Sequence, residues 1–167
     1  MKSAICIRLL FLAVLSAFTT EKNFAQDNAT AHSSPILPLY YEIKDALVAG
    51  NAAAASVKAT AFISAVTLSE TGLINDEITN ALLKDAGIIP QTKDVSKQRA
   101  SFSILSSDMY TLAKAVKLTE EPVYYAYCPM KKAHWLSSSA AIKNPYFGNA
   151  MLTCGRVEDL ITAEKSR

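Results

Sequence analysis

In the segment LYYEIKDALVAG, apolar residues recur at helical spacing: Tyr40, Ile43 and Leu47 follow steps of three and four, and Gly50 supplies a stop. The next segment, AAAASVKATAFISAV, is rich in helix-forming alanine, and Asn51 stands where an N-cap is needed. The two segments predict antiparallel helices joined by a short turn. The second helix is expected to bury a narrow stripe made of Val57, Ala61 and Ala65.

A third helix is predicted in EITNALLKDAG, which Asn75 or Asp76 can cap. Ile78 and Leu82 share a face of this helix, four residues apart. Gly87 stands where a left-handed C-terminal cap would end it.

The longest periodic segment predicts a fourth helix from about Thr92 to Lys117, with Gln98 as a polar residue in its apolar seam. The apolar positions of the seam are Val95, Phe102, Leu105, Met109, Leu112 and Val116. Four such helices predict a mainly α protein folded as an up-and-down four-helix bundle. The side chains expected inside it are Tyr40, Val57, Ile78, Phe102, Leu105, Met109 and Leu112.

The pattern changes in the last third of the chain, where EEPVYYAYCPM alternates as a strand does and NPYFG is typical of a turn. The rest of this segment has few periodic positions and is interrupted by Pro129, Pro145, Gly148 and Gly155. We therefore expect residues 122–157 to form an irregular lobe, with a short strand or hairpin, packed on the helical scaffold.

The N-terminal segment differs from the rest of the chain. Lys2 and Arg8 precede the apolar run LLFLAVLSAF, which at about ten residues is too short to span a bilayer. We interpret residues 1–26 as a signal peptide that is removed, residues 27–37 as a flexible arm and residues 38–167 as a single domain. The mature protein is then periplasmic or secreted and has no stable membrane anchor.

Composition and motifs argue against several classes of function. Of the 167 residues, 50% are hydrophobic and 19% are charged, with a net charge of +2. Because this balance offers no broad basic face, we expect no nucleic-acid partner. The sequence has no HExxH, GxSxG or CxxC motif and no phosphate-binding loop, so we expect that the protein is not an enzyme.

Cys6 lies in the predicted signal peptide, so the mature chain is expected to keep two cysteines. Each of them has a methionine within three residues. Cys128 and Met130 are two apart, a spacing that directs both side chains to one side of a strand. Met151 and Cys154 are three apart, a spacing that suits one face of a helical turn. Thiolates and thioethers are soft donors that select Cu(I) or Ag(I), whereas zinc rarely accepts methionine. These four residues predict a soft-metal site, with zinc as a less favoured ion.

Two further side chains lie next to this motif pair. His134 would add an imidazole ligand, and the ring of Trp135 would shield a monovalent cation through a contact worth only ~1 to 2 kcal/mol. The spacing is not a recognised zinc pattern, because neither cysteine has a second cysteine or histidine close by except His134.

The same cysteines support a second interpretation. Outside the cytosol paired thiols tend to oxidise, and a Cys128–Cys154 disulfide closing a loop of about 26 residues would contribute roughly 3 to 4 kcal/mol. The chain would then be a disulfide-stapled protein-interaction module of the cell envelope that binds no metal. Its contact patch would comprise Tyr124, Tyr146 and Phe147.

The segments YCPM, HWLSSSAAIKNPYFG and MLTCG together resemble a bacterial exported domain of unknown function. This domain is also found as a C-terminal extension of the adaptor subunits, or membrane fusion proteins, of heavy-metal efflux pumps. The resemblance covers about residues 39–157, and His134 departs from the family's pattern. The matching residues are Cys128, Pro129, Met130, Trp135, Leu136, Asn144, Pro145, Tyr146, Gly148, Met151, Cys154 and Gly155.

The resemblance implies a structural motif and a link to metal export. The residues of the structural motif are Asn144, Pro145, Tyr146, Gly148 and Gly155. Together with the sulfur residues, the resemblance predicts an exported accessory protein that sequesters Cu(I) or Ag(I) or delivers it to an efflux system. A heavy-metal efflux adaptor subunit or another envelope protein is the expected partner.

Overall fold

The computed structural model describes residues 35–69 and 74–162. The predicted signal peptide and residues 27–34 of the predicted arm lie outside the described residues. Within the part that is described, no helix is both long enough and apolar enough to cross a membrane.

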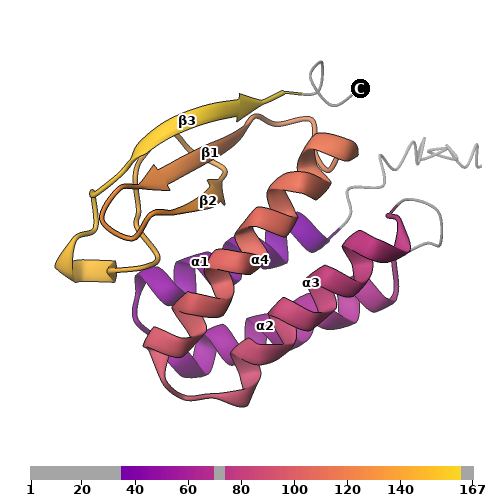
Figure 1. The fold of residues 1–167 in the computed structure, drawn as a ribbon, viewed down its shortest axis with the longest axis horizontal. Helices are drawn as coiled ribbons and strands as arrows, with labels where there is room; N and C mark the ends of the chain where they lie inside the picture. The colour runs from indigo at the N-terminus through magenta and orange to yellow at the C-terminus, as the bar shows by residue number, and fades with distance from the viewer. Residues whose placement is uncertain (1–34, 70–73, 163–167) are drawn as a thin grey trace, which may run out of the picture. The chain divides into compact units, whose positions relative to one another are not determined.

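Four α-helices occupy the first two-thirds of the described chain, as the apolar spacing predicts (Figure 1). Their bounds are α1 Ile36–Val48, α2 Ala52–Thr67, α3 Asp76–Ile88 and α4 Val95–Ala115. Consecutive helices pack against one another, α1 on α2, α2 on α3 and α3 on α4. The mainly α fold is thereby confirmed, while the up-and-down bundle stays a prediction.

Side-chain oxygens cap three of these helices. Asn51 and Asn75, both predicted caps, accept hydrogen bonds from the backbone N–H three residues later, at 2.9 and 2.8 Å. Asp94 caps α4 by accepting from the amide of Ser96 at 2.8 Å. Gly50 adopts a left-handed φ of 69°, so the first helix ends at its predicted stop.

The second helix buries a different face from the predicted one. Val57 is 66% exposed, and Ala61 and Ala65 are only half-buried. In a helix with alanine on several sides, the small residues define no single apolar face, so the larger Phe62 and Val66 decide which face is buried. The prediction of an inward Val57 is therefore wrong. The residues that face the core are Ala55, Ala59, Phe62 and Val66.

The third helix does not end at Gly87, so the left-handed cap predicted there is wrong. It continues to Ile88 and leads into the 3-10 turn η1, Ile89–Gln91. Ile89 is fully buried, so packing its side chain in the core favours continuation of the chain into this turn. Gln91 Nε2 donates to the Gly87 carbonyl at 2.8 Å, which satisfies one of the open carbonyls at the helix end.

The polar residue in the seam of α4 is part of the core. Gln98 is fully buried, and its Nε2 lies 2.9 to 3.1 Å from four oxygens. These are the carbonyls of Ala52, Ile89 and Thr92 and the hydroxyl of Ser56. Through its Nε2, Gln98 thus connects α4 to α2 and η1.

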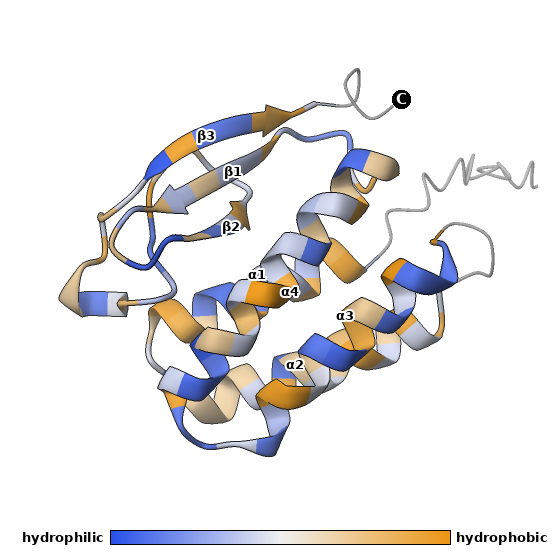
Figure 2. Ribbon diagram, in the orientation of Figure 1, coloured by the Kyte–Doolittle hydropathy of each residue, from blue (hydrophilic) through white to orange (hydrophobic). Residues whose placement is uncertain are grey.

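The last third of the chain contains a three-stranded antiparallel sheet with a register shift between β1 and β3 at Tyr125 and Ala126 (Figure 1). Its strands are β1 Val123–Cys128, β2 Ala133–Ser137 and β3 Arg156–Ile161, in the order β2–β1–β3. The expected strand or hairpin corresponds to β1 and β2, but the expectation of an otherwise irregular lobe missed β3. That strand lies at a sheet edge and mixes polar with apolar residues (Figure 2), so no hydrophobic alternation marks it in the sequence.

Buried and half-buried side chains connect the sheet to α1 and α4. The hydroxyl of Tyr40 in α1 lies 2.7 Å from Ser106 Oγ in α4 and accepts from the Leu136 amide of β2 at 3.0 Å. Tyr110 of α4 stacks on Tyr125 of β1, with ring centroids 3.8 Å apart. One hydrophobic core therefore joins the helices and the sheet.

Candidate thiol and thioether site

The sheet brings the two cysteines together. Cys128 ends β1, and Cys154 stands two residues before β3, whose Arg156 pairs with Tyr127. Their Sγ atoms lie 3.9 Å apart, and both cysteines are free. Cys128 is fully buried, whereas Cys154 is partly exposed. Antiparallel pairing of β1 with β3 thus converts a separation of 26 residues into a direct contact between sulfurs.

Met130 lies in the tight turn between β1 and β2. The amide of Lys132 donates to the Cys128 carbonyl at 2.8 Å, and Lys132 takes a left-handed φ of 55° to close this turn. The backbone of Met130 is hydrogen-bonded to the Cys154 thiol, while its side chain is 66% exposed. The predicted pair Cys128 and Met130 therefore flanks Cys154 from the β1 side.

Met151 follows the 3-10 turn η2, Gly148–Ala150. Its carbonyl accepts from the Cys154 amide at 3.1 Å, and its side chain is 37% exposed. The structure thus brings all four predicted donor residues into one neighbourhood, with the thiols in contact and both thioether side chains exposed.

Trp135 lies on the same side of the sheet as Cys128. The register pairs Ala126 with Trp135 and Cys128 with Ala133, and residues two apart on a strand face the same way. Trp135 is 1% exposed. A Cβ added at Gly155 would lie 2.9 Å from Trp135 Cη2, so the indole packs directly beside the residue that follows Cys154.

His134 points to the opposite side of the sheet, because it pairs with Tyr127 rather than with Cys128. Its ring stacks on Tyr125 and lies tilted against Tyr127, with ring centroids 4.5 Å apart in both cases. Its Nε2 lies 2.8 Å from Glu158 Oε2, an interaction that lowers the pKa of Glu158. The structure therefore does not bring His134 to the two thiols.

The residues of the structural motif anchor the β2–β3 connection, residues 138–155. Tyr146 is 4% exposed and donates from its hydroxyl to the His134 carbonyl of β2. Burial is the main cause that raises the pKa of Tyr146. Pro145 is also buried. Gly148 has a φ of 54°, and a Cβ there would lie 2.7 Å from the Val48 carbonyl, so this glycine lets the connection touch α1.

The buried position of Tyr146 corrects one expectation. The patch predicted for a protein-interaction module requires Tyr124, Tyr146 and Phe147 to be exposed. Tyr146 packs in the core, edge-on to Trp135 at 6.0 Å, and the other two rings are half-buried. The three aromatic residues therefore do not form an exposed patch, because the connection folds inward to cover the sheet.

Lys132 is a residue of the site that sequence reasoning missed. Its left-handed backbone closes the β1–β2 turn and so places Met130 beside Cys154. Glycine, asparagine or aspartate at this position would have indicated a left-handed turn residue, but the turn reads PMKK and contains none of them.

The environment of Cys154 favours its protonated form. Partial burial is the main cause that raises the pKa of Cys154, followed by the hydrogen bond that it shares with Cys128 and by repulsion from a Cys128 thiolate. A hydrogen bond with the backbone of Met130 opposes this effect. A thiol must lose its proton before it binds a metal ion. Binding at this pair is therefore expected to release protons.

The sulfur separation suits two ligands of one ion. Thiolates about 2.3 Å from a shared ion, at tetrahedral or trigonal angles, lie about 3.8 to 4.0 Å apart. The observed distance is 3.9 Å. Within residues 35–69 and 74–162, no group of three or more His, Cys, Asp or Glu side chains is placed to hold a metal.

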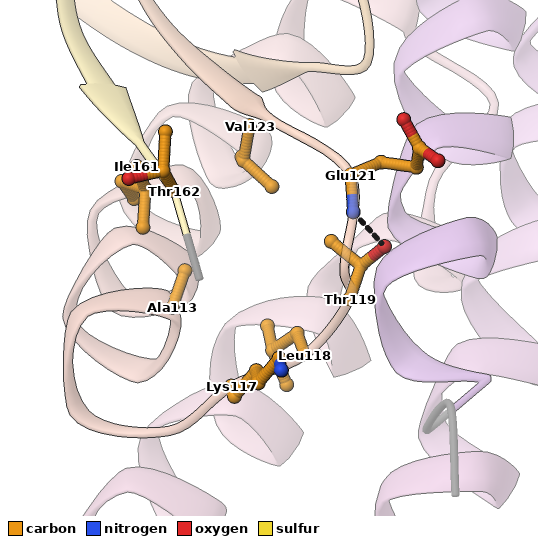
Figure 3. Close-up of a pocket in the computed structure, with 8 residues that line it drawn as sticks. All are labelled: Ala113, Lys117, Leu118, Thr119, Glu121, Val123, Ile161 and Thr162. Carbon is orange, nitrogen blue, oxygen red and sulfur yellow. Dashed lines mark hydrogen bonds between the residues drawn. The ribbon is translucent and has the colours of Figure 1, made fainter. Parts of the chain in front are cut away.

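A small hollow lies at the far end of the sheet from the cysteines, beside Val123 and Ile161 (Figure 3). Its cavity volume is about 10 Å³. That is about the space of one water molecule, so the hollow is too small for an organic ligand.

These features define a class of protein: a small, mainly α domain whose C-terminal antiparallel sheet carries two neighbouring free thiols flanked by methionines. The chain belongs to the family described as Protein of unknown function (DUF3347), whose model matches residues 36–121. The matched residues comprise the four helices and end just before β1. No curated protein and no solved structure matches the chain.

Proposed function

We propose that this protein is an exported accessory protein that binds Cu(I) or Ag(I) and sequesters the ion or delivers it to an efflux system. The observation that carries the proposal is the 3.9 Å separation of Cys128 Sγ and Cys154 Sγ. In this proposal both cysteines bind as thiolates, and Met130 and Met151 bind as neutral thioethers. Trp135 shields the site, and His134 is left out of the ligand set.

The gradation in exposure supports exchange of the ion with a partner. Cys128 is buried and Cys154 is partly exposed, while the side chains of Met130 and Met151 are 66% and 37% exposed. A buried thiolate retains a soft ion, and exposed thioethers are accessible to the donors of a second protein. The proposed partner is an efflux adaptor subunit or another envelope protein, and an up-and-down bundle of the four helices is the proposed scaffold.

The raised pKa of Cys154 gives the proposal a pH dependence. Because protons compete with the ion for the thiol, the apparent affinity for Cu(I) should rise with pH from neutral up to and beyond the ordinary thiol pKa of 9.0. Methionine thioethers carry no proton in this range, so they do not contribute to the slope.

The same separation also favours a second candidate, a disulfide-stapled interaction module. A disulfide bond is about 2.05 Å long, so Cys128 and Cys154 would need to approach by about 1.9 Å. The contact patch would then have to use surfaces other than the buried Tyr146. A thiol count on protein isolated from its native compartment separates the two candidates, because complete oxidation that resists mild reductant favours the staple.

The test is a titration of the reduced mature protein with Cu(I) in competition with a chelator. We expect the Cys128→Ser, Cys154→Ser double variant to lose affinity by at least about a hundredfold, and the Met130→Leu, Met151→Leu double variant by about tenfold. The control is Met109→Leu, which changes a buried methionine of α4 outside the site and should leave the affinity unchanged. Unchanged affinity in the cysteine double variant refutes the proposal.

A further inference from the structure

Asn144 is a fully buried amide at the centre of the β2–β3 connection. Its Nδ2 donates to the Cys154 carbonyl at 2.7 Å. Its Oδ1 accepts from the amides of Tyr146 at 2.8 Å and Phe147 at 3.3 Å. Its own backbone amide donates to the Leu152 carbonyl at 2.8 Å. Both ends of the side-chain amide are thus used.

These hydrogen bonds join two parts of the connection. On the Oδ1 side, Asn144 organises the turn that carries Tyr146. On the Nδ2 side, it holds the peptide group between Cys154 and Gly155. Gly155, which follows this peptide group, lies close to β1. A Cβ added at Gly155 would be 2.8 Å from the carbonyl oxygen of Tyr127. The hydrogen bond from Asn144 and the close packing at Gly155 together hold the backbone segment that carries the Cys154 side chain.

The two sulfurs are fixed in different ways. Cys128 lies in β1, where it pairs with Ala133, and its side chain is fully buried. Cys154 lies outside the strands, and its carbonyl is held by a side chain ten residues away. The separation of the sulfurs thus depends most on what holds the Cys154 segment.

We infer that Asn144 is a positioning residue that sets the separation of the Cys128 and Cys154 thiols through its hydrogen bond to the Cys154 carbonyl. This inference deepens the proposed function and rests on it only for its consequence, which is that loss of the Asn144 amide weakens binding of a soft monovalent ion. The geometric part concerns the thiols alone and is tested without metal.

The experiment measures how readily the folded protein forms the Cys128–Cys154 disulfide in equilibrium with oxidised and reduced dithiothreitol. Each conversion forms one protein disulfide and reduces the cyclic disulfide of the reagent, which takes up two electrons and two protons. Asn144→Asp keeps an acceptor for the amide of Tyr146 but removes the donor to the Cys154 carbonyl. We expect the equilibrium constant for disulfide formation to fall by about tenfold, equivalent to about 30 mV.

Three variants separate positioning from general destabilisation. Asn144→Ser keeps a short side chain that can accept a hydrogen bond in the turn but has no amide to donate one. It should also lower the equilibrium constant for disulfide formation. This variant keeps the test decisive if a buried aspartate prevents Asn144→Asp from folding. Tyr146→Phe removes a hydroxyl donor from the same connection, and Asn75→Asp makes the same change at the cap of α3. Both should leave the constant unchanged.

The inference is overturned if folded Asn144 variants match the wild-type constant, if Tyr146→Phe lowers it as much, or if the wild-type pair forms no disulfide at any reagent ratio. Cu(I) titration of the same proteins completes the test, with about a tenfold loss of affinity expected in the Asn144 variants. A wild-type protein that binds no Cu(I) would overturn the proposed function, while the redox comparison would still decide the role of Asn144.

Discussion

At the scale of single residues, the site depends on how closely the Cys154 segment approaches β1. Gly155 has a φ of 149°, and a Cβ there would lie 2.8 Å from the Tyr127 carbonyl and 2.9 Å from Trp135 Cη2. Both neighbours are held in place, one by the sheet and the other by burial. Only glycine therefore fits beside Cys154 without a shift of the backbone.

Gly155→Ala should lower the free energy of unfolding by roughly 1 to 3 kcal/mol, because it combines backbone strain with a clash against a carbonyl. Urea denaturation measures this change. The matched control is Gly87→Ala, which has nothing within 4 Å of the added Cβ and lies inside α3. The control should gain about 0.5 to 1 kcal/mol. Equal effects of the two substitutions would contradict the close approach at Gly155.

The residue types of the candidate site could be predicted from the sequence. Which side chains face the same side of the sheet could not, because that depends on strand register. The cysteines and methionines were predicted as ligands from residue type and spacing alone, and the structure places the two thiols 3.9 Å apart. His134 is six residues from Cys128, yet it faces the other side of the sheet because its strand pairs it with Tyr127. A one-residue shift in register would have reversed this outcome, and single-sequence patterns do not fix register.

At the scale of secondary structure elements, the helices were predictable because their stripes are long and their caps are chemically distinct. The caps at Asn51 and Asn75 are examples. The buried face of α2 was not predictable, because alanine supplies too little contrast between faces. The strand β3 was not predictable either, because its stability comes from backbone pairing with β1 rather than from a buried stripe.

The sheet is coupled to the helices through the hydroxyl of Tyr40, and Tyr40→Phe tests this coupling. Loss of the hydroxyl leaves the buried Leu136 amide without this acceptor and removes a partner of Ser106, at an expected cost of about 1 to 3 kcal/mol. Hydrogen exchange should increase at the Leu136 amide. The control Tyr41→Phe changes the neighbouring, less buried tyrosine of α1 and should cost less. Unchanged exchange at Leu136 would contradict the coupling.

At the scale of the whole molecule, one core joins the helices to the sheet, while the thiol pair lies at the end of β1. The Cys128→Ser, Cys154→Ser double variant should keep helical circular dichroism nearly intact, with hydrogen exchange increased in residues 151–155. Phe102→Ala should instead cost about 3 to 5 kcal/mol and weaken the whole fold, since Phe102 is fully buried and stacks on Tyr40. Global unfolding of the cysteine double variant would show that the thiols support the scaffold.

The central claim is that Cys128, Cys154 and the adjacent methionines bind a soft monovalent ion without an imidazole. X-ray absorption spectroscopy at the copper edge, on reduced mature protein loaded with one equivalent of Cu(I), tests this claim most directly. The proposal predicts a first coordination shell made of sulfur alone, identical in wild-type protein and in a His134→Gln variant. A shell that contains nitrogen or oxygen, or a protein that retains no copper after desalting, would contradict it.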